Sequence, residues 1–319
     1  PGTVRSKTPQ EGEVGWSDLV KGPIAFPNAE LDDLVLLRAD GVPTYNFGVV
    51  VDDLDMGITH VIRGDDHVNN TPRQIHIFSA LQKPLPEFGH VPMILGADGE
   101  RLSKRHGAVS VTQYRDEGYL PEALVNYLAR LGWSHGDEEV FSTKQFISWF
   151  DLAHVSRSPA QFNPEKLGWI NQQYLKAAPD ARLAALLEPE LRKRGVQLAA
   201  GPELPRVVNL VKDRANTVAQ LAEEAMLFYT LEVKPAPAEW SGEALKALRT
   251  LKARLGGVSW ERAAINQAIK ETVKSSGLKM PQVAMPLRHI VTGRTQTPSI
   301  DAVLELLGRD TVLLRLGQF

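Results

Sequence analysis

Cysteine is absent from the 319-residue chain. This absence excludes disulfides and any zinc site built on thiolate ligands, and it agrees with a reducing compartment. No apolar run approaches the roughly 20 residues that a membrane-spanning helix needs, and no charged-then-apolar leader opens the chain. We therefore expect a cytoplasmic protein that does not associate with a membrane.

The chain also lacks a basic charge excess. Its formal net charge is −2, with 36 lysine and arginine residues against 38 aspartate and glutamate residues. Indiscriminate nucleic-acid binding normally shows as a strongly basic balance, so the sequence disfavours that class of protein. A folded RNA bound over one locally basic face stays compatible with this balance, because only the distribution of charge matters there.

One segment, Met93 to Gly107, is the most informative part of the sequence. It joins an apolar run, a turn dipeptide at Asp98-Gly99 and the cationic loop Arg101-Leu102-Ser103-Lys104-Arg105. A loop with a hydroxyl and several cations can neutralise the charge that grows on a polyphosphate in a transition state. The alternative for an isolated Ser-Lys-Arg sequence is a solvated basic turn. The surrounding segments favour phosphate binding.

Together with those segments, the loop resembles the Lys-Met-Ser-Lys-Ser element of class I aminoacyl-tRNA synthetases, in the form typical of bacterial glutamyl-tRNA synthetases. The resemblance covers most of the chain, including Pro43–Phe47, Val50–Asp53, Thr59–Leu81 and Phe162–Asn171. It implies a ligase that activates L-glutamate with ATP as an adenylate. The glutamyl group would then pass to the 2′-hydroxyl of the terminal adenosine of tRNA(Glu).

The expected fold is α/β followed by all-α. By resemblance, residues 1–40 end an acceptor-binding insertion, and residues 41–110 form the second half of a Rossmann-like catalytic domain with the phosphate loop. Residues 111–170 would form a stem-contact connector, and residues 171–319 an all-helical anticodon-binding domain in two subdomains, with a linker near 233–240.

Local patterns predict individual elements. Proline and glycine punctuate the first forty residues, which predicts turns and short strands there. A helix is expected to start at a cap on Asn70 or Thr71, with Pro72 in its first turn. Short β-branched runs predict buried strands over Tyr45–Val51, Ile58–Ile62 and His90–Leu95. A capping box at Ser142 and Gln145 predicts a helix that starts there. Helical spacing of apolar residues predicts further helices over 121–131, 182–194, 204–231, 244–255 and 260–274. Short helical turns are expected after Ser299 and Asp310.

The resemblance assigns the phosphate chemistry. It places Lys104, Ser103 and Arg101 in the catalytic loop, and it assigns ATP binding to Lys104, Arg101, His67 and Leu95. Arg101 stands where the family usually has lysine, so the charge is kept while its geometry changes from a point to a fork. Ser103 could instead cap the turn. His106 could equally make a local structural hydrogen bond.

Arg63 ends a predicted buried strand, which is a poor place for an unpaired cation. By resemblance it binds the side-chain carboxylate of glutamate, and Tyr45 borders the same pocket. A bidentate guanidinium explains a preference for glutamate over glutamine. A salt bridge from Arg63 to Asp65 or Asp66 is the alternative.

The remaining partners also follow from the resemblance. Arg214 would inspect the third anticodon base, Arg288 and Arg294 would lie near the anticodon, and Asp52 would contact the tRNA end. The basic run Arg192-Lys193-Arg194 falls at a predicted helix end and is interpreted as structural. Mg²⁺ should arrive with ATP, with no metal site in the protein and no zinc. A monomer is expected.

The family's other ATP motif, His-x-Gly-His, does not occur in the sequence. We therefore expect the 319-residue polypeptide alone to be inactive in adenylate formation. Two alternatives to a glutamate ligase stay open: a glutaminyl-tRNA synthetase, which normally reads anticodons with β-barrels, and a non-catalytic tRNA-binding remnant. The tRNA-modifying paralogue lacks an anticodon domain, and the predicted helical tail argues against it.

Overall fold

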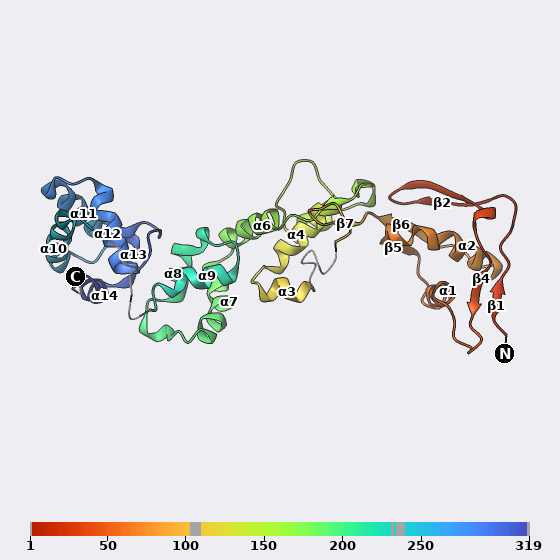
Figure 1. The fold of residues 1–319 in the computed structure, drawn as a ribbon, viewed down its shortest axis with the longest axis horizontal. Helices are drawn as coiled ribbons and strands as arrows, with labels where there is room; N and C mark the ends of the chain where they lie inside the picture. The colour runs from red at the N-terminus through yellow and green to blue at the C-terminus, as the bar shows by residue number, and fades with distance from the viewer. Residues whose placement is uncertain (1, 103–109, 231–232, 234–239, 318–319) are drawn as a thin grey trace. The chain divides into compact units, whose positions relative to one another are not determined.

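The computed structural model describes residues 2–102, 110–230, 233 and 240–317. The chain divides into two compact units, one of residues 1–110 and 122–170, the other of residues 111–121 and 171–319. Strands occur in the first unit, and the described part of the second is helical (Figure 1). The expected order of α/β followed by all-α is confirmed. Within the described residues, no helix is both long and apolar enough to cross a bilayer.

The first forty residues form two antiparallel strand pairs, as predicted. β1 (Val4–Ser6) pairs with β4 (Leu34–Leu37), and β2 (Glu13–Asp18) pairs with β3 (Gly22–Pro27). Alternate residues of β2 point inward, so Val14 packs against Leu31, Ile75 and Phe88. The same alternation buries Asp18 at the end of the strand.

A parallel strand pair forms the centre of the first unit. β5 (His60–Gly64) lies beside β6 (Glu87–Val91), and the helix α2 (Thr71–Ala80) connects them after the short 3₁₀ helix η2 (Asp65–Asn70). The parallel strands and the helix confirm the predictions, although β5 is shifted two residues along the chain and none of its residues is buried, contrary to the prediction of a buried strand. Asn70 occupies the N-cap position, as predicted, but its side chain makes no capping hydrogen bond and contacts His67 Nδ1 at 3.1 Å.

The strand predicted over His90–Leu95 is interrupted. β6 ends at Val91, and β7 (Ile94–Leu95) pairs instead with β8 (Ala160–Gln161). Pro92 lies between β6 and β7 and has no N–H to donate to a strand ladder, which explains the break.

The strand predicted over Tyr45–Val51 is wrong, because these residues begin the helix α1 (Tyr45–Asp55). Phe47, Val50 and Leu54 recur at spacings of three and four residues, and all three belong to one apolar cluster with Ile77 and Phe78 of α2. A short apolar run of β-branched residues fits a strand and a buried helix equally well until its packing partners are known.

Three further helices continue the chain. They are α3 (Val111–Asp116) in the second unit, α4 (Pro121–Gly132), which ends at Gly132 as predicted, and α5 (Thr143–Trp149). The predicted capping box is confirmed, since Ser142 Oγ accepts from Gln145 N at 3.2 Å and Gln145 Oε1 accepts from Ser142 N at 2.9 Å. The helix α6 (Pro164–Ala177) follows β8.

The rest of the second unit is built from helices and short 3₁₀ turns. The helices are α7 (Asp180–Lys193), α8 (Leu204–Val211), α9 (Val218–Met226), α10 (Gly242–Gly257), α11 (Arg262–Ser276), α12 (Met280–Thr292), α13 (Ile300–Leu307) and α14 (Arg309–Arg315).

Two differences from the prediction have local causes. The prediction of a single helix over 204–231 is wrong. The 3₁₀ turn η6 (Lys212–Arg214) follows α8, and a new helix, α9, starts at Thr217, whose side chain accepts from Gln220 N at 3.2 Å. α12 was not predicted, because it contains Pro286. Most of the linker predicted near 233–240 lies outside the described residues.

Candidate functional site

Arg63, on β5, donates hydrogen bonds to three neutral acceptors. Its Nε donates to His90 Nε2 at 3.2 Å, and its Nη2 donates to Thr71 Oγ1 at 2.8 Å and to Gln74 Oε1 at 2.9 Å. Nη1 has no hydrogen-bond partner among the described residues. We call these four residues the Arg63 cluster. It holds the guanidinium in one orientation and leaves one edge open to a ligand.

The expected alternative, a salt bridge from Arg63 to Asp65 or Asp66, is not formed. Asp65 pairs with Lys21 at 2.8 Å, and Asp66 pairs with Arg101 at 3.1 Å. Burial lowers the pKa of Arg63, while Tyr45 and the carboxylates of Asp53, Asp18 and Asp66 oppose that shift from a distance. A guanidinium remains protonated under these conditions, so the cluster holds a positive charge without a contacting carboxylate among the described residues.

Asp18 and His90 lie behind Arg63, and sequence reasoning missed both as site residues. Neither side chain is exposed, and Asp18 Oδ2 lies 2.5 Å from His90 Nδ1. Burial raises the pKa of Asp18, but hydrogen bonds from the Lys21 backbone, His90 and the Val20 backbone outweigh it and lower the pKa to about 2. Burial lowers the pKa of His90, so the imidazole is neutral. The parallel register sets Arg63 opposite His90, and this pairing is visible only in the structure.

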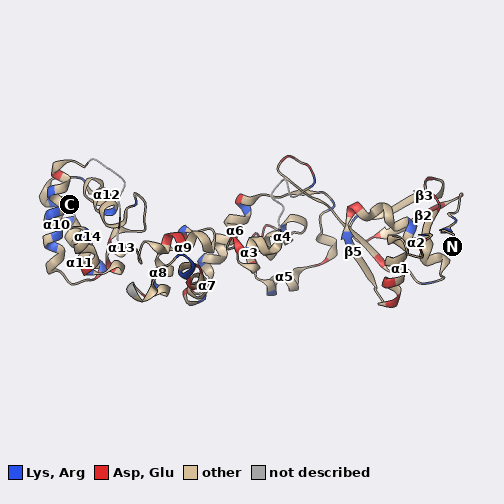
Figure 2. Cartoon of the chain, turned by 60° about the horizontal axis from the view of Figure 1, so that its bottom comes forward, with Lys and Arg blue, Asp and Glu red and all other residues tan. Residues whose placement is uncertain are grey.

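Tyr45 and His67 lie close together. Tyr45 is the first residue of α1 and is 56% exposed, and its ring centroid lies 6.1 Å from that of His67 in η2. Asp52 is exposed further along α1, whose acidic end is red in Figure 2. An exposed tyrosine next to a half-buried histidine provides a flat surface that a ligand can contact.

Only the beginning of the cationic loop is described. Ser103, Lys104 and His106 lie outside the described residues. Leu95 and Arg101 face each other across a tight turn in which Gly99 has φ +79°, as the Asp98-Gly99 dipeptide predicts. The contact between Arg101 Nη2 and Asp66 Oδ2, at 3.1 Å, joins the start of the loop to η2, the element that carries His67.

Two of the three predicted anticodon arginines meet in the second unit. Arg214 Nε and Arg294 Nη1 lie 3.7 Å and 3.2 Å from the same carboxylate oxygen of Glu224. Arg288 is bonded elsewhere, with its Nε donating to Thr297 Oγ1 at 2.9 Å. Beside Arg294 lies a pocket of about 470 Å³ with Thr230 and Thr292 among its lining residues.

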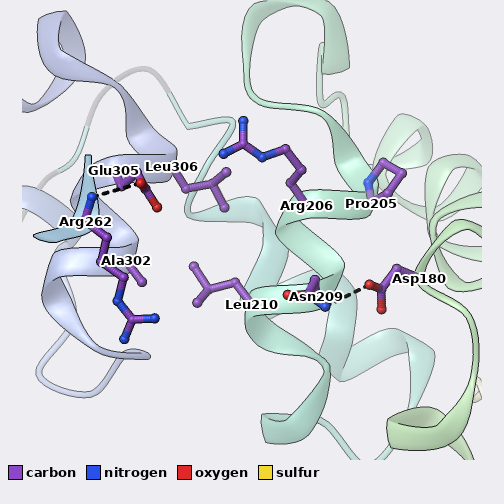
Figure 3. A pocket seen from close by; sticks show the side chains of 9 residues that line it. All are labelled: Asp180, Pro205, Arg206, Asn209, Leu210, Arg262, Ala302, Glu305 and Leu306. Carbon is purple, nitrogen blue, oxygen red and sulfur yellow. Dashed lines mark hydrogen bonds between the residues drawn. The ribbon is translucent and has the colours of Figure 1, made fainter. Parts of the chain in front are cut away.

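Another pocket of about 390 Å³ in the second unit contains none of the predicted residues (Figure 3). Its lining charges are largely bonded within the protein: Asn209 donates to Asp180 at 2.8 Å, and Arg262 Nε donates to Asp301 at 2.8 Å. We therefore interpret these groups as structural.

Comparisons with known proteins match both units. A family model described as the catalytic domain of class I tRNA synthetases (E and Q) matches residues 1–169, and an anticodon binding domain model matches residues 182–319. A glutamate–tRNA ligase from Nitrosospira multiformis is 62% identical over 324 residues, covering 99% of this chain and 69% of that protein. The corresponding protein from Nitrosomonas europaea is 62% identical over 316 residues, covering 98% of this chain and 68% of that protein. The crystal structure of a glutamate tRNA ligase from Elizabethkingia meningosepticum in complex with its amino acid has a TM-score of 0.89 at 29% identity, covering 99% of this chain and 67% of that chain.

Proposed function

The chain belongs to the glutamate–tRNA ligases of class I, and on this basis we propose that its first unit activates L-glutamate with ATP while its second unit binds tRNA(Glu). The glutaminyl alternative is disfavoured, since the similar proteins above carry the name glutamate–tRNA ligase. A glutamate carboxylate oxygen attacks the α-phosphorus of ATP, the bond to pyrophosphate breaks, and glutamyl-adenylate forms. The 2′-hydroxyl of the terminal adenosine then attacks the carbonyl carbon, and AMP leaves.

The open edge of Arg63 is the observation that supports glutamate as the amino acid. The neutral acceptors on Nε and Nη2 leave the positive charge available to a substrate carboxylate at Nη1. A carboxylate would accept charge-assisted hydrogen bonds from this edge. The amide oxygen of glutamine could accept from Nη1 as well, but it carries no charge, so its hydrogen bond to the guanidinium is weaker than that of a carboxylate.

The start of the cationic loop and η2 would hold ATP. We assign His67 and Leu95 to the nucleoside end, and Arg101, Ser103 and Lys104 to the phosphates. The ammonium of Lys104 is best used on the pyrophosphate, where negative charge develops as the bond to the α-phosphorus breaks. Magnesium would arrive with ATP, bound mainly by the phosphates. Arg101 would exchange Asp66 for a phosphate oxygen.

Replacing Arg63 tests this assignment. In the natural polypeptide that carries this sequence, we expect Arg63→Ala to lower kcat/KM for glutamate by about a hundredfold or more, because charge-assisted hydrogen bonds to the substrate are lost. The KM for ATP should change much less. Arg38→Ala is the matched control, since Arg38 is an exposed arginine paired with Asp40 at 2.9 Å.

The same variant distinguishes an enzyme from a tRNA-binding remnant. If Arg63→Ala keeps its tRNA affinity and loses aminoacylation, the first unit performs chemistry. An unchanged kcat/KM for glutamate would reject the assignment of Arg63 to the substrate carboxylate.

A further inference from the structure

Arg63 is the outer member of a chain of three side chains that leads into the protein. Asp18 Oδ2 lies 2.5 Å from His90 Nδ1, and His90 Nε2 lies 3.2 Å from Arg63 Nε. The three residues come from three strands, β2, β6 and β5. The side chains of Asp18 and His90 are fully buried, so no solvent molecule can replace either partner without rearrangement.

The partners determine which nitrogen of His90 carries the proton. Arg63 Nε can only donate, so His90 Nε2 must present its lone pair. The ring proton therefore sits on Nδ1, where the carboxylate of Asp18 accepts it. Thr71 fits the same assignment, because its hydroxyl oxygen accepts from Arg63 Nη2 and lies 3.1 Å from His90 Nε2, to which it can donate.

We propose that Asp18 and His90 are positioning residues for amino acid selection: the Asp18 carboxylate holds His90 in the Nδ1–H tautomer, and the accepting Nε2 of that tautomer aims the open edge of Arg63 at the substrate carboxylate. This inference rests on the proposed role of Arg63. Neither residue touches the substrate. Their effect on the reaction is transmitted through the orientation of the guanidinium.

The groups around His90 act in opposite directions: burial and the charge of Arg63 lower the pKa of the imidazole, while Asp18 and Asp65 raise it, and the lowering effects dominate. Asp18 accepts at Nδ1, Arg63 Nε donates at Nε2, the Thr71 hydroxyl lies 3.1 Å from Nε2, and Asp65 contributes a more distant negative charge. The aromatic rings of Trp16 and Phe88 cover the remainder. A second proton on Nε2 would face the N–H of Arg63, which disfavours the imidazolium.

Asp18→Asn keeps the size and shape of the side chain and changes the hydrogen bonds that it makes to His90 and Trp16. Oδ1 of Asp18 accepts backbone N–H groups of Val20, Lys21 and His90 at 2.9–3.0 Å, so the asparagine oxygen must keep that position. The asparagine NH₂ then replaces Oδ2 and donates to His90 Nδ1, and the Trp16 Nε1–H, which donates to Oδ2 at 3.2 Å, loses its acceptor. The ring proton moves to Nε2, where it meets the N–H of Arg63, and the guanidinium loses its orientation.

We expect Asp18→Asn to raise the KM for glutamate by about tenfold or more and to reduce discrimination against glutamine by a similar factor, because one charge-linked hydrogen bond is lost. The KM for ATP should stay nearly constant. Asp33→Asn is the control, since Asp33 is a carboxylate of the same unit that accepts the Thr8 N–H at 2.8 Å. Equal shifts in both KM values, or no shift in a folded variant, would overturn the proposal.

A second measurement decides the matter if Asp18→Asn does not fold. Long-range ¹H–¹⁵N spectra of the histidine-labelled wild-type protein should show His90 as the Nδ1–H tautomer, and an Nε2–H signal would overturn the proposal. A failure of the positioning role can also be distinguished from a failure of the proposed function. If Arg63→Ala impairs glutamate use and Asp18→Asn does not, only the positioning role fails; if Arg63→Ala has no effect, the substrate assignment itself fails.

Discussion

Gln74 presents a neutral oxygen to Arg63, and a second hydrogen bond fixes that orientation. Its Oε1 accepts from Arg63 Nη2 at 2.9 Å, while its Nε2 donates to Asn46 Oδ1 at 3.0 Å. A carboxylate at this position would neutralise the guanidinium before any substrate arrived. At the scale of single residues, selectivity for an acidic amino acid thus depends on neutral hydrogen-bond partners at Arg63, with no carboxylate of the described residues in contact with it.

Gln74→Glu tests this dependence. The new carboxylate would pair with Arg63, so we expect kcat/KM for glutamate to fall by about tenfold and the preference over glutamine to fall with it. Steady-state kinetics with both amino acids measure the effect, and Gln10→Glu serves as an exposed control. An unchanged preference for glutamate would contradict the claim that neutral partners keep the charge available.

Asp18 also predicts a dependence of stability on acid. The pKa of its carboxyl falls from the ordinary value of 3.8 to about 2 on folding, so its stabilising contribution is present above pH 3.8 and is lost as the pH falls toward about 2. The shift corresponds to about 2 kcal/mol. Urea unfolding of the wild type and Asp18→Asn from about pH 6 downward should show the difference in unfolding free energy shrinking below about pH 4. A difference that stays constant down to about pH 2 would contradict this.

At the scale of elements, Gly118 lies where the residues after α3 meet the start of α9. Its φ is +87°, and a Cβ there would lie 2.8 Å from Ala219 N and 2.9 Å from Val218 N. Its carbonyl oxygen accepts from Val218 N at 2.9 Å, so the glycine backbone supplies one partner for the first N–H groups of that helix. Both the left-handed φ and the close approach require glycine.

Gly118→Ala should therefore destabilise the protein more than a Gly→Ala substitution at a position where a positive φ is the only obstacle to a side chain. Gly41 is the matched control, because its φ is +83° and a Cβ there has no heavy atom within 4 Å. We expect about 1 kcal/mol for Gly41→Ala and about 2–4 kcal/mol for Gly118→Ala, measured by urea unfolding. Equal losses would show that the contact with α9 contributes nothing.

Sequence patterns predicted those elements whose signal is local. The Ser142 capping box, Pro72 in the first turn of α2 and the parallel strands around it needed no distant contact. α1 was mistaken for a strand because only the packing of Phe47 and Val50 on α2 distinguishes the two. α12 was not predicted because Pro286 lies inside it, and the burial of neighbouring residues stabilises this helix despite the proline.

At the scale of the whole molecule, the proposed tasks are divided between the two units. The Arg63 cluster lies in the first unit, and the pair Arg214 and Arg294 lies in the second. Glu224 holds both arginines through one carboxylate oxygen, so their remaining N–H groups are kept near one place. Such a pair can bind the edge of a splayed base or its phosphate.

This division predicts separable defects. Arg214→Ala should raise the KM for tRNA and weaken tRNA binding by about 1–3 kcal/mol while leaving the KM for glutamate unchanged, because the two sites belong to different units. Arg192→Ala is the control, since Arg192 is an exposed residue paired with Glu188 on the same helix. Equal effects of the two variants on tRNA binding would reject Arg214 as an anticodon contact.

The order of amino acids alone was enough to indicate the family and the change from α/β to helical structure, and it proposed Arg63 as a contact for the substrate carboxylate. These conclusions depend on motifs and periodicities that lie within short segments. Only the tertiary structure decided what surrounds Arg63, because Asp18 lies 72 residues from His90 in the chain and His90 lies 27 residues from Arg63. Strand pairing and burial bring these residues into contact, and no local pattern encodes which buried acceptor will face a given donor.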